Sequence, residues 1–354
     1  MMRVGFRLDV NSEIGYGHLQ RCIILAESFQ KRGISSEFYV RADDGAKSFI
    51  KNQPISCSYI DAFSTAAEVV EFLKQNIPAG SIIISDLAYP EFIRNATEAR
   101  LFFDMITSMY SHILIDALGE QSFRENLDDI SCHYLISPYC DSKSDSQSGG
   151  EGKILAGTSY FIIDSGFFEQ KERQINNVAT KVLVSFGGSD PRELSANVLE
   201  SLALVSTFEF EIKVVVGPGF SPEYESRLVV MSQLIGHKVE LIRNVSTLAP
   251  LMYWCDLAIC SSGLTKYELA ATGTPSILIS IDEEHDRVNK SFANEHTCID
   301  FGVFVKGDEY RLAGEVESLA GDHKTRNMLS CKGLNVIDGK GASRIVDYLL
   351  KEIH

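Results

Sequence analysis

Short apolar runs alternate along this chain with longer segments in which apolar residues recur at helical spacing. The first pattern is typical of strands buried in a parallel sheet, and the second indicates helices with one face on that sheet. In the first half of the chain, the pattern predicts strands at residues 4–8, 36–40, 57–60, 81–85, 112–115, 133–136 and 161–163. It predicts helices there at residues 19–29, 45–52, 66–75 and 90–109.

The same alternation starts again in the second half of the chain. Strands are predicted at residues 181–186, 211–216, 239–242, 257–260 and 276–281. Helices are predicted at residues 194–204, 248–255, 265–272 and 343–352. Because repeated alternation of strand and helix builds parallel sheets with helices on both faces, we predict an α/β protein with two doubly wound parallel-sheet domains.

Two polar stretches divide this pattern. Residues 141–153 are rich in glycine and serine and show no apolar periodicity, which predicts a loop. Residues 169–177 are charged and polar, and we place the domain boundary there, with one domain at 1–168 and the other at 169–354. The last helix is a candidate to pack back on the first domain.

Composition and charge narrow the class of protein. The chain has 354 residues, 45% of them hydrophobic, and a formal net charge of −15, which argues against non-specific binding to nucleic acid or to anionic membranes. Its eight cysteines form no CxxC pair, and several of them stand among apolar or small residues, which is typical of reduced thiols in a protein core. We see no apolar run of transmembrane length and no N-terminal signal segment, so we expect a cytoplasmic protein.

The joint between the first strand and the first helix carries the strongest candidate chemistry. Gly15 and Gly17 allow a sharp turn close to a ligand, and the unpaired N–H groups of the helix start attract an anion. His18 stands in the first turn, where the helix dipole favours the neutral imidazole that accepts a proton. The alternative is a helix-end histidine with a satisfied hydrogen bond. Cys22 is one turn away, so a Cys/His pair is formally possible, but its spacing places it in the core.

Two loops of the second half have the form of phosphate sites. The sequence FGGSD at residues 186–190 follows a buried strand and precedes a helix, so its free amides suit a phosphate, although a tight structural turn explains it equally well. Residues 261–268 repeat this form, with a predicted serine or threonine cap at the helix start. One turn inside, Glu268 suits paired ribose hydroxyls, and the alternative is an exposed helix glutamate.

Carboxylates also stand at the ends of predicted strands. Asp86 and Asp116 each follow one, at the sheet edge where ligands of open parallel sheets bind. Residues 282–287 place four acids and an arginine around His285. This tract suits a metal, a set of sugar hydroxyls, or a solvated turn with one or two functional members, which we rank first because no HxxxH or HxH spacing accompanies it.

Four motifs together resemble a known family, the PseG/SpsG-like nucleotide-sugar hydrolases of bacterial nonulosonic acid and polysaccharide pathways, which are built like MurG-type GT-B glycosyltransferases. Two of them are the tracts at residues 182–191 (VLVSFGGSDP) and 255–275 (CDLAICSSGLTKYELAATGTP). The other two are spaced sets of residues: Arg7, Asp9, Gly15, Gly17, His18, Arg21 and Cys22, and then Gly157, Thr158, Tyr160 and Phe167.

The resemblance implies a GT-B-like fold of two Rossmann-like domains facing across a cleft. UDP would be held mainly by the C-terminal domain, and the sugar would lie under the N-terminal glycine loop. The nucleotide-binding residues it implies are Gly187, Gly188, Ser189, Ser262, Gly263, Thr265 and Glu268. The residues it places near the substrate are Gly15, Gly17, Arg21, Asp86, Tyr89, Tyr160, His285 and Asp286.

The same resemblance makes His18 the base that activates water against the anomeric carbon, with Asp9 orienting the loop or a sugar hydroxyl. The expected activity is hydrolysis of a UDP-linked amino or deoxy sugar, without cofactor or metal. The sequence departs from the family at residues 86–89, where the family has an Asp-His-Tyr tract, and at His285-Asp286, which aligns with an Asn-Gln pair. Transfer of the sugar to an acceptor and inert nucleotide-sugar binding are the alternatives.

Overall fold

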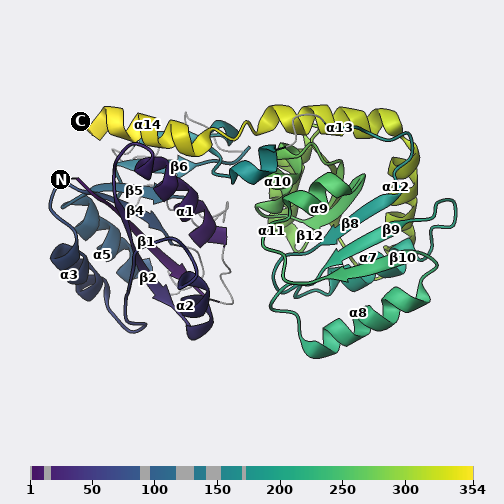
Figure 1. The fold of residues 1–354 in the computed structure, drawn as a ribbon, viewed down its shortest axis with the longest axis horizontal. Coiled ribbons are helices and arrows are strands. Elements are labelled where there is room, and N and C mark those ends of the chain that lie inside the picture. Colours follow the sequence, from purple (N-terminus) through teal and green to yellow (C-terminus); the bar gives the residue numbers. More distant parts are fainter. Residues whose placement is uncertain are drawn as a thin grey trace. The chain divides into compact units, whose positions relative to one another are not determined.

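The computed structural model describes residues 2–11, 17–87, 96–116, 131–140, 153–169 and 173–353. The chain divides into two compact units (Figure 1). Unit 1 consists of residues 1–164 and 339–354, and unit 2 of residues 165–338. Each is built on its own parallel sheet, as the alternating pattern predicts.

Unit 1 contains, among its described residues, a sheet of seven parallel strands in the order β3-β2-β1-β4-β5-β6-β7. The strands are β1 (Val4–Val10), β2 (Ser36–Ala42), β3 (Cys57–Tyr59), β4 (Ile82–Asp86), β5 (Ser111–Ile115), β6 (Tyr134–Ser137) and β7 (Lys153–Ala156). Because β1 and β4 are neighbours at the centre of the sheet, their carboxyl ends lie side by side.

Helices cover both faces of this sheet. They are α1 (Gly17–Gln30), α2 (Asp44–Ile50), α3 (Ala66–Asn76), α5 (Ala96–Thr107) and α14 (Gly341–Ile353), with the 3₁₀ helix η2 (Thr158–Tyr160). One apolar cluster joins the strands to α1, α2 and α14, and a second joins them to α3 and α5. Because successive side chains of a strand point to opposite faces of the sheet, the strands of this sheet contribute residues to both cores.

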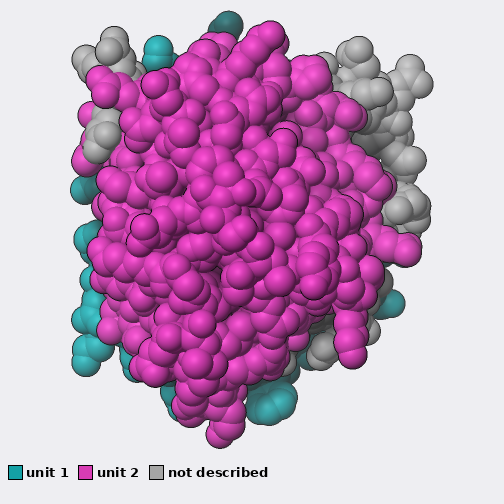
Figure 2. All heavy atoms as spheres, turned by 90° about the vertical axis from the view of Figure 1, so that its right-hand side faces the viewer, with its two compact units in different colours: residues 1–164, 339–354 teal, residues 165–338 magenta. Residues whose placement is uncertain are grey.

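Unit 2 has a parallel sheet of six described strands in the order β10-β9-β8-β11-β12-β13. They are β8 (Lys181–Ser185), β9 (Glu211–Val215), β10 (Lys238–Ile242), β11 (Leu257–Ser261), β12 (Ser276–Ser280) and β13 (Ile299–Val303). Its helices are α7 (Leu194–Leu202), α8 (Pro222–Leu234), α9 (Ala249–Trp254), α10 (Thr265–Ala271), α11 (Glu283–Ala293), α12 (Glu309–Gly321), α13 (His323–Val336) and the 3₁₀ helix η3 (Ser165–Phe168). Figure 2 shows unit 2 in magenta as one compact body.

One predicted strand is wrong. Residues 161–163 are buried but are not part of the sheet, and its seventh strand is β7, which the sequence pattern assigns to no element. Both segments are apolar, so periodicity alone does not separate them. Residues 161–163 pack against helix α14 instead of pairing with a strand. A Cβ on Gly341, the first residue of α14, would come 2.0 Å from the carbonyl oxygen of Phe161.

The last helix returns to unit 1. The side chains of Ile345, Val346 and Leu349 are fully buried in the core that contains α1. Arg32 pairs with Asp347 at 2.6 Å, and Arg344 donates to the carbonyl oxygen of Ser159 at 2.9 Å. No helix in the described part of the chain combines the length and the apolar character needed to cross a membrane.

Candidate functional site

The strand and the helix on either side of the first glycine loop form as the sequence predicts. Helix α1 begins at Gly17, so His18 stands in its first turn, while Gly15 lies outside the described residues. Leu19, Cys22 and Phe29 are fully buried against the sheet, which confirms the helical spacing. The His18 side chain is 14% exposed, so it lies at the edge of the buried layer.

His18 is held by a carboxylate from the neighbouring strand. Its Nδ1 atom lies 2.7 Å from Oδ1 of Asp86, the last residue of β4, whose side chain is fully buried. Arg21 Nη2 is also 3.0 Å from this nitrogen, but the ionised Asp86 carboxylate only accepts hydrogen bonds, so its 2.7 Å contact with Nδ1 needs a proton on Nδ1. Nδ1 therefore carries the proton and donates to Asp86, which leaves the lone pair on Nε2.

Arg21 fixes the carboxylate in place. Its Nε donates to Oδ2 of Asp86 and its Nη2 donates to Oδ1 at 2.5 Å, which is a bidentate pair. Burial by itself would raise the pKa of Asp86, but the charge of Arg21 and the hydrogen bonds from Arg21 and His18 outweigh burial and hold that pKa well below its ordinary value. Asp86 is therefore an anion at all ordinary pH values.

A second layer, which sequence reasoning missed, supports Arg21. Its Nη1 donates to the hydroxyl of Tyr139 at 3.0 Å, and that hydroxyl donates to the carbonyl oxygen of Asp116 at 3.0 Å. Ser137 donates to Oδ2 of Asp116 at 2.6 Å. The only available signal was the position of Tyr139 just after a predicted strand. Arg21 and Asp86 are thus bound to each other and to His18, and their predicted contact with a substrate stays a prediction.

Cys22 belongs to the core. Its Sγ atom is 3.5 Å from Oδ2 of Asp86, and its side chain is fully buried. Burial first, and the Asp86 charge second, raise the pKa of the Cys22 thiol well above its ordinary value. The thiol stays protonated, so the Cys/His nucleophilic pair is not supported.

Asp9 does not join this network. In the register of the two strands Leu8 pairs with Asp86, so the next residue, Asp9, points to the opposite face of the sheet. There Arg7 Nη1 donates to Asp9 Oδ1 at 2.5 Å, and both side chains are buried. Oδ2 of Asp9 has no hydrogen-bond partner among the described residues. The two residues predicted as catalytic are therefore held on opposite faces, and a role for Asp9 stays a prediction.

The first predicted phosphate loop follows β8 in unit 2. Gly187 has a φ of 77°, which only glycine adopts readily, and residues 187–189 are exposed. Asp190 is buried and caps α7, accepting from the backbone N–H groups of Leu194 and Ser195, both at 2.8 Å. This carboxylate occupies the helix start, so the amides left for an anion are those of the glycine turn.

The second predicted phosphate loop joins β11 to α10. Gly263 has a φ of 105°. The predicted serine or threonine cap of α10 is wrong, because the cap position is Leu264, which offers no side-chain acceptor. The hydroxyl oxygen of Ser262 is buried and has no hydrogen-bond partner among the described residues. A helix start without a side-chain cap leaves N–H groups for another acceptor.

Helix α10 presents two charged residues of different kinds. Glu268 lies in its first turn and is half-buried, which fits neither a core residue nor a fully exposed glutamate. Lys266 is 1% exposed, and its Nζ donates to Oδ1 of Asn289 at 3.4 Å. Asn289 in turn donates to the hydroxyl of Ser280 at 3.0 Å. The sequence pattern did not single out this buried cation.

The acidic tract after β12 is a helix start, not the solvated turn that we ranked first. Asp282 caps α11 by accepting from the backbone N–H of His285 at 2.8 Å, and it also contacts Nδ1 of His285 at 2.6 Å. Lys290 donates to Oδ2 of Asp286 at 2.5 Å, while Oδ1 is buried without a partner among the described residues. No group of three or more potential metal ligands gathers anywhere in the described ranges.

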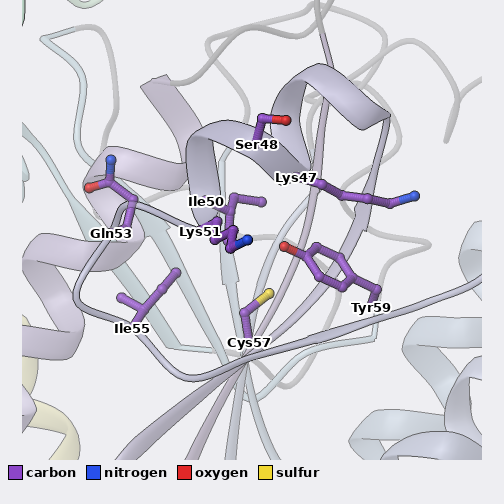
Figure 3. A pocket seen from close by; sticks show the side chains of 8 residues that line it. All are labelled: Lys47, Ser48, Ile50, Lys51, Gln53, Ile55, Cys57 and Tyr59. Atoms are coloured by element: carbon purple, nitrogen blue, oxygen red, sulfur yellow. The ribbon is translucent and has the colours of Figure 1, made fainter.

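The remaining predicted site residues lie apart from these loops. Tyr160 is in η2, half-buried against the core of unit 1, and Tyr89 lies outside the described residues. A separate hollow of about 390 Å³ opens beside α2 and the edge strand β3 (Figure 3). It is lined by Lys47, Ser48, Ile50, Lys51, Gln53, Ile55, Cys57 and Tyr59. None of the predicted site residues is among them.

Comparison with proteins of known sequence finds distant relatives of this chain. No protein-family model matches the chain. An uncharacterized protein of Methanocaldococcus jannaschii is 29% identical over 299 residues, which cover 80% of this chain and 56% of that protein. SpsG, a spore coat polysaccharide biosynthesis protein of Bacillus subtilis, is 23% identical over 350 residues, 98% of each chain.

A third relative names a reaction. It is the pseudaminic acid cytidylyltransferase and UDP-2,4-diacetamido-2,4,6-trideoxy-beta-L-altropyranose hydrolase of Helicobacter pylori, 22% identical over 312 residues. The match covers 86% of this chain and 48% of that protein. The chain thus spans about half the length of the archaeal and Helicobacter relatives.

Solved structures show the same architecture. MurG of Acinetobacter baumannii matches with a TM-score of 0.67 at 12% identity, over 99% of each chain. HepE of Anabaena, solved in complex with UDP, matches with a TM-score of 0.63 at 14% identity, over 99% of this chain and 100% of that one. The predicted fold is confirmed, and so is the predicted resemblance: this chain has the GT-B fold and is homologous to SpsG and to the pseudaminic acid UDP-sugar hydrolase.

Proposed function

We propose that this protein is a nucleotide-sugar enzyme of polysaccharide biosynthesis, and that its reaction is the hydrolysis of a UDP-linked amino or deoxy sugar. The observation that carries the proposal is the buried Asp86 carboxylate on Nδ1 of His18. This contact leaves Nε2 as the proton acceptor, and Nε2 makes no hydrogen bond to any described residue. Such an arrangement suits a general base.

The proposed chemical step is direct displacement at the anomeric carbon. His18 Nε2 takes a proton from water as the water oxygen bonds to the anomeric carbon. The bond from that carbon to the diphosphate oxygen breaks, and UDP leaves with the electron pair. The imidazolium that forms is stabilised by the Asp86 anion, which keeps the ring in one orientation.

The proposed nucleotide site is the pair of loops in unit 2. The diphosphate would accept hydrogen bonds from the N–H groups of Gly188 and Ser189 and from the start of α10 near Ser262 and Thr265. These donors would stabilise the charge on the leaving group. The Glu268 carboxylate would accept hydrogen bonds from the two ribose hydroxyls. Two observations support this assignment: the exposed glycine turn and the helix start without a side-chain cap.

The relatives support the class of substrate. One acts on a UDP-linked diacetamido-trideoxy sugar by its name, and another belongs to spore coat polysaccharide biosynthesis. A transferase is the second candidate, because 100 residues of this chain are 36% identical to an N-acetylglucosamine transferase of Mannheimia succiniciproducens. Either enzyme would use His18 as base, against water in one case and an acceptor hydroxyl in the other.

Hydrolysis in ¹⁸O-labelled water tests the proposal. The protein is incubated with UDP-2,4-diacetamido-2,4,6-trideoxy-β-L-altropyranose and, separately, with UDP-N-acetylglucosamine, and the products are examined by mass spectrometry. We expect free sugar and UDP without any acceptor, with the label on the anomeric oxygen of the sugar. Label in UDP would overturn attack at carbon. Product formed only with an added acceptor would establish the transferase, and binding without turnover would establish an inert binding protein.

A further inference from the structure

The loop after β9 packs directly on the glycine turn that follows β8. Gly219 donates its N–H to the carbonyl oxygen of Gly188 at 2.8 Å. A Cβ on Gly217 would come 2.3 Å from that oxygen and 2.5 Å from the carbonyl oxygen of Gly187. The carbonyl oxygens of two successive peptides therefore both face Gly217.

This contact sets the direction of two N–H groups. In a planar trans peptide the C=O of one residue and the N–H of the next point in opposite directions. Because the carbonyls of Gly187 and Gly188 face Gly217, the N–H groups of Gly188 and Ser189 point away from it. Neither N–H reaches an acceptor among the described residues, and both residues are exposed. Two successive N–H groups on one side form an anion-binding nest.

Gly217 is a glycine because of space, not because of its backbone angles. Its φ lies outside the left-handed region, whereas Gly187 has a φ of 77°. No side chain fits at a site where a Cβ would lie 2.3 Å from a backbone oxygen, so any other residue must push the two chains apart. Pressure at this point would turn the peptides whose N–H groups form the nest.

A second tether holds the other end of the turn. Tyr224, in the first turn of α8, donates its hydroxyl to Oδ2 of Asp190 at 2.7 Å, and Asp190 follows the turn directly. Burial, and then the Asp190 charge, raise the pKa of this phenol, so the hydroxyl keeps its proton. The segment from Gly217 to Tyr224 thus contacts both ends of residues 187–190.

We propose that the Gly217–Gly219 loop is a positioning element for the diphosphate, which turns the amides of Gly188 and Ser189 toward it. The proposal deepens the proposed function and rests on it. It assigns a role to a loop that contributes no group to the ligand itself. The loop would determine affinity for the phosphates and leave affinity for the nucleoside unchanged.

Calorimetry with UDP and with uridine separates positioning from general stability. For Gly217→Ala we expect binding of UDP to weaken by about tenfold or more, because hydrogen bonds to a charged phosphate are lost. We expect binding of uridine to change by less than about twofold, since the nucleoside makes no contact with the nest. Gly236→Ala is the matched control, because its Cβ would meet no atom within 4 Å and its φ lies outside the left-handed region.

Two milder variants keep the test decisive if Gly217→Ala does not fold. A Cβ on Gly219 would come 3.1 Å from the Gly188 oxygen, so Gly219→Ala should give a smaller loss in the same direction. Tyr224→Phe removes the second tether without adding volume. Equal losses for UDP and uridine, or unchanged UDP binding by folded variants, would overturn the proposal. Failure of the folded wild-type protein to bind UDP would instead overturn the proposed function, and this proposal would fall with it.

Discussion

In each unit a strand is followed by glycines and then a helix, but the residues described around these two places present opposite kinds of chemistry. In unit 1 the joint after β1 leads to buried side chains with full charges, in which Asp86 holds His18 and Arg21 holds Asp86. In unit 2 the joint after β8 exposes backbone amides, and its one buried carboxylate, Asp190, serves only the protein. Under the proposed function, the same topological position would supply a proton acceptor in one unit and an anion site in the other.

The difference follows from what each task needs. A general base must hold one tautomer and orientation, which requires side-chain partners on a fixed strand and helix. An anion site needs several donors at short distance and no titrating group, which backbone amides supply at any pH. Side-chain substitutions should therefore damage the first joint, whereas only backbone distortions should damage the glycine turn.

The largest effect is expected for His18→Ala. Loss of the base should lower turnover by about 10³-fold, within the range typical of general bases. The affinity for UDP should change by no more than about threefold, because the proposed nucleotide site belongs to the other unit. Steady-state kinetics and calorimetry measure the two. His323→Ala is the control, since this exposed histidine also begins a helix, α13. Undiminished turnover in His18→Ala would remove His18 from the mechanism.

Asp86→Asn comes next, with an expected loss of about 10²-fold in turnover. An amide at this position can donate to Nδ1, so the ring proton moves to Nε2 and the base is lost. The substitution also leaves the buried Arg21 guanidinium without a counter-charge, so thermal stability should fall. A rate equal to that of the wild type, measured well below the melting temperature, would contradict the proposed tautomer.

The same carboxylate predicts how stability depends on pH. The pKa of Asp86 is lowered in the folded protein, so its ion pair contributes stability at pH values above the carboxyl pKa of the unfolded chain, about 4. That contribution is lost as the pH falls below about 4 toward the folded pKa. The difference between the melting temperatures of wild type and Asp86→Asn, recorded from pH 7 to pH 3, should therefore stay constant down to about pH 4 and begin to narrow below it. A difference in melting temperature that does not change with pH would show that the ion pair of Asp86 does not make this contribution to stability.

Much of this architecture was predictable because buried elements have recognisable patterns of apolar residues in the sequence. The central strands of both sheets and the start of α1 follow from apolar runs and helical spacing. Helices α8 and α13 were missed because they carry only a weak apolar stripe, with few fully buried residues. The tract after Asp282 was predicted as a turn because it is rich in acidic residues, although Asp282 is the N-cap of helix α11.

The contacts of the site were less predictable, because they join residues far apart in the chain. Asp86 meets His18 across 68 positions, and Tyr139 meets Arg21 across 118. A strand-end position indicates that a carboxylate is near the ligand edge, but it does not say which partner it binds. Asp9 shows the converse: adjacency in the motif suggested a shared role with His18, and strand alternation separates the two.

Glu268→Ala tests the second proposed phosphate loop of unit 2, between β11 and α10, with a smaller effect. Loss of the proposed ribose contacts should weaken UDP binding about threefold to tenfold, the value of one or two hydrogen bonds. Turnover at saturating substrate should fall less than in His18→Ala. Glu223→Ala is the matched control, because Glu223 is an exposed glutamate in the first turn of α8. Equal affinity of Glu268→Ala and wild type in calorimetry would remove the ribose assignment.

The smallest effect is expected for Cys22→Ala, and it sharpens what the first joint is for. Its thiol is 3.5 Å from the Asp86 carboxylate, whereas a nucleophilic cysteine needs a lowered pKa. Burial and the carboxylate instead raise the pKa of Cys22, so it is a packing residue. Turnover should change by less than about twofold, and stability should fall by about 1 kcal/mol from lost packing. Loss of activity in a folded Cys22→Ala protein, or rapid inactivation of the native enzyme by iodoacetamide at Cys22, would show that the joint works through sulfur. The Asp86 carboxylate would then act on the thiol, and His18 would no longer be its main partner.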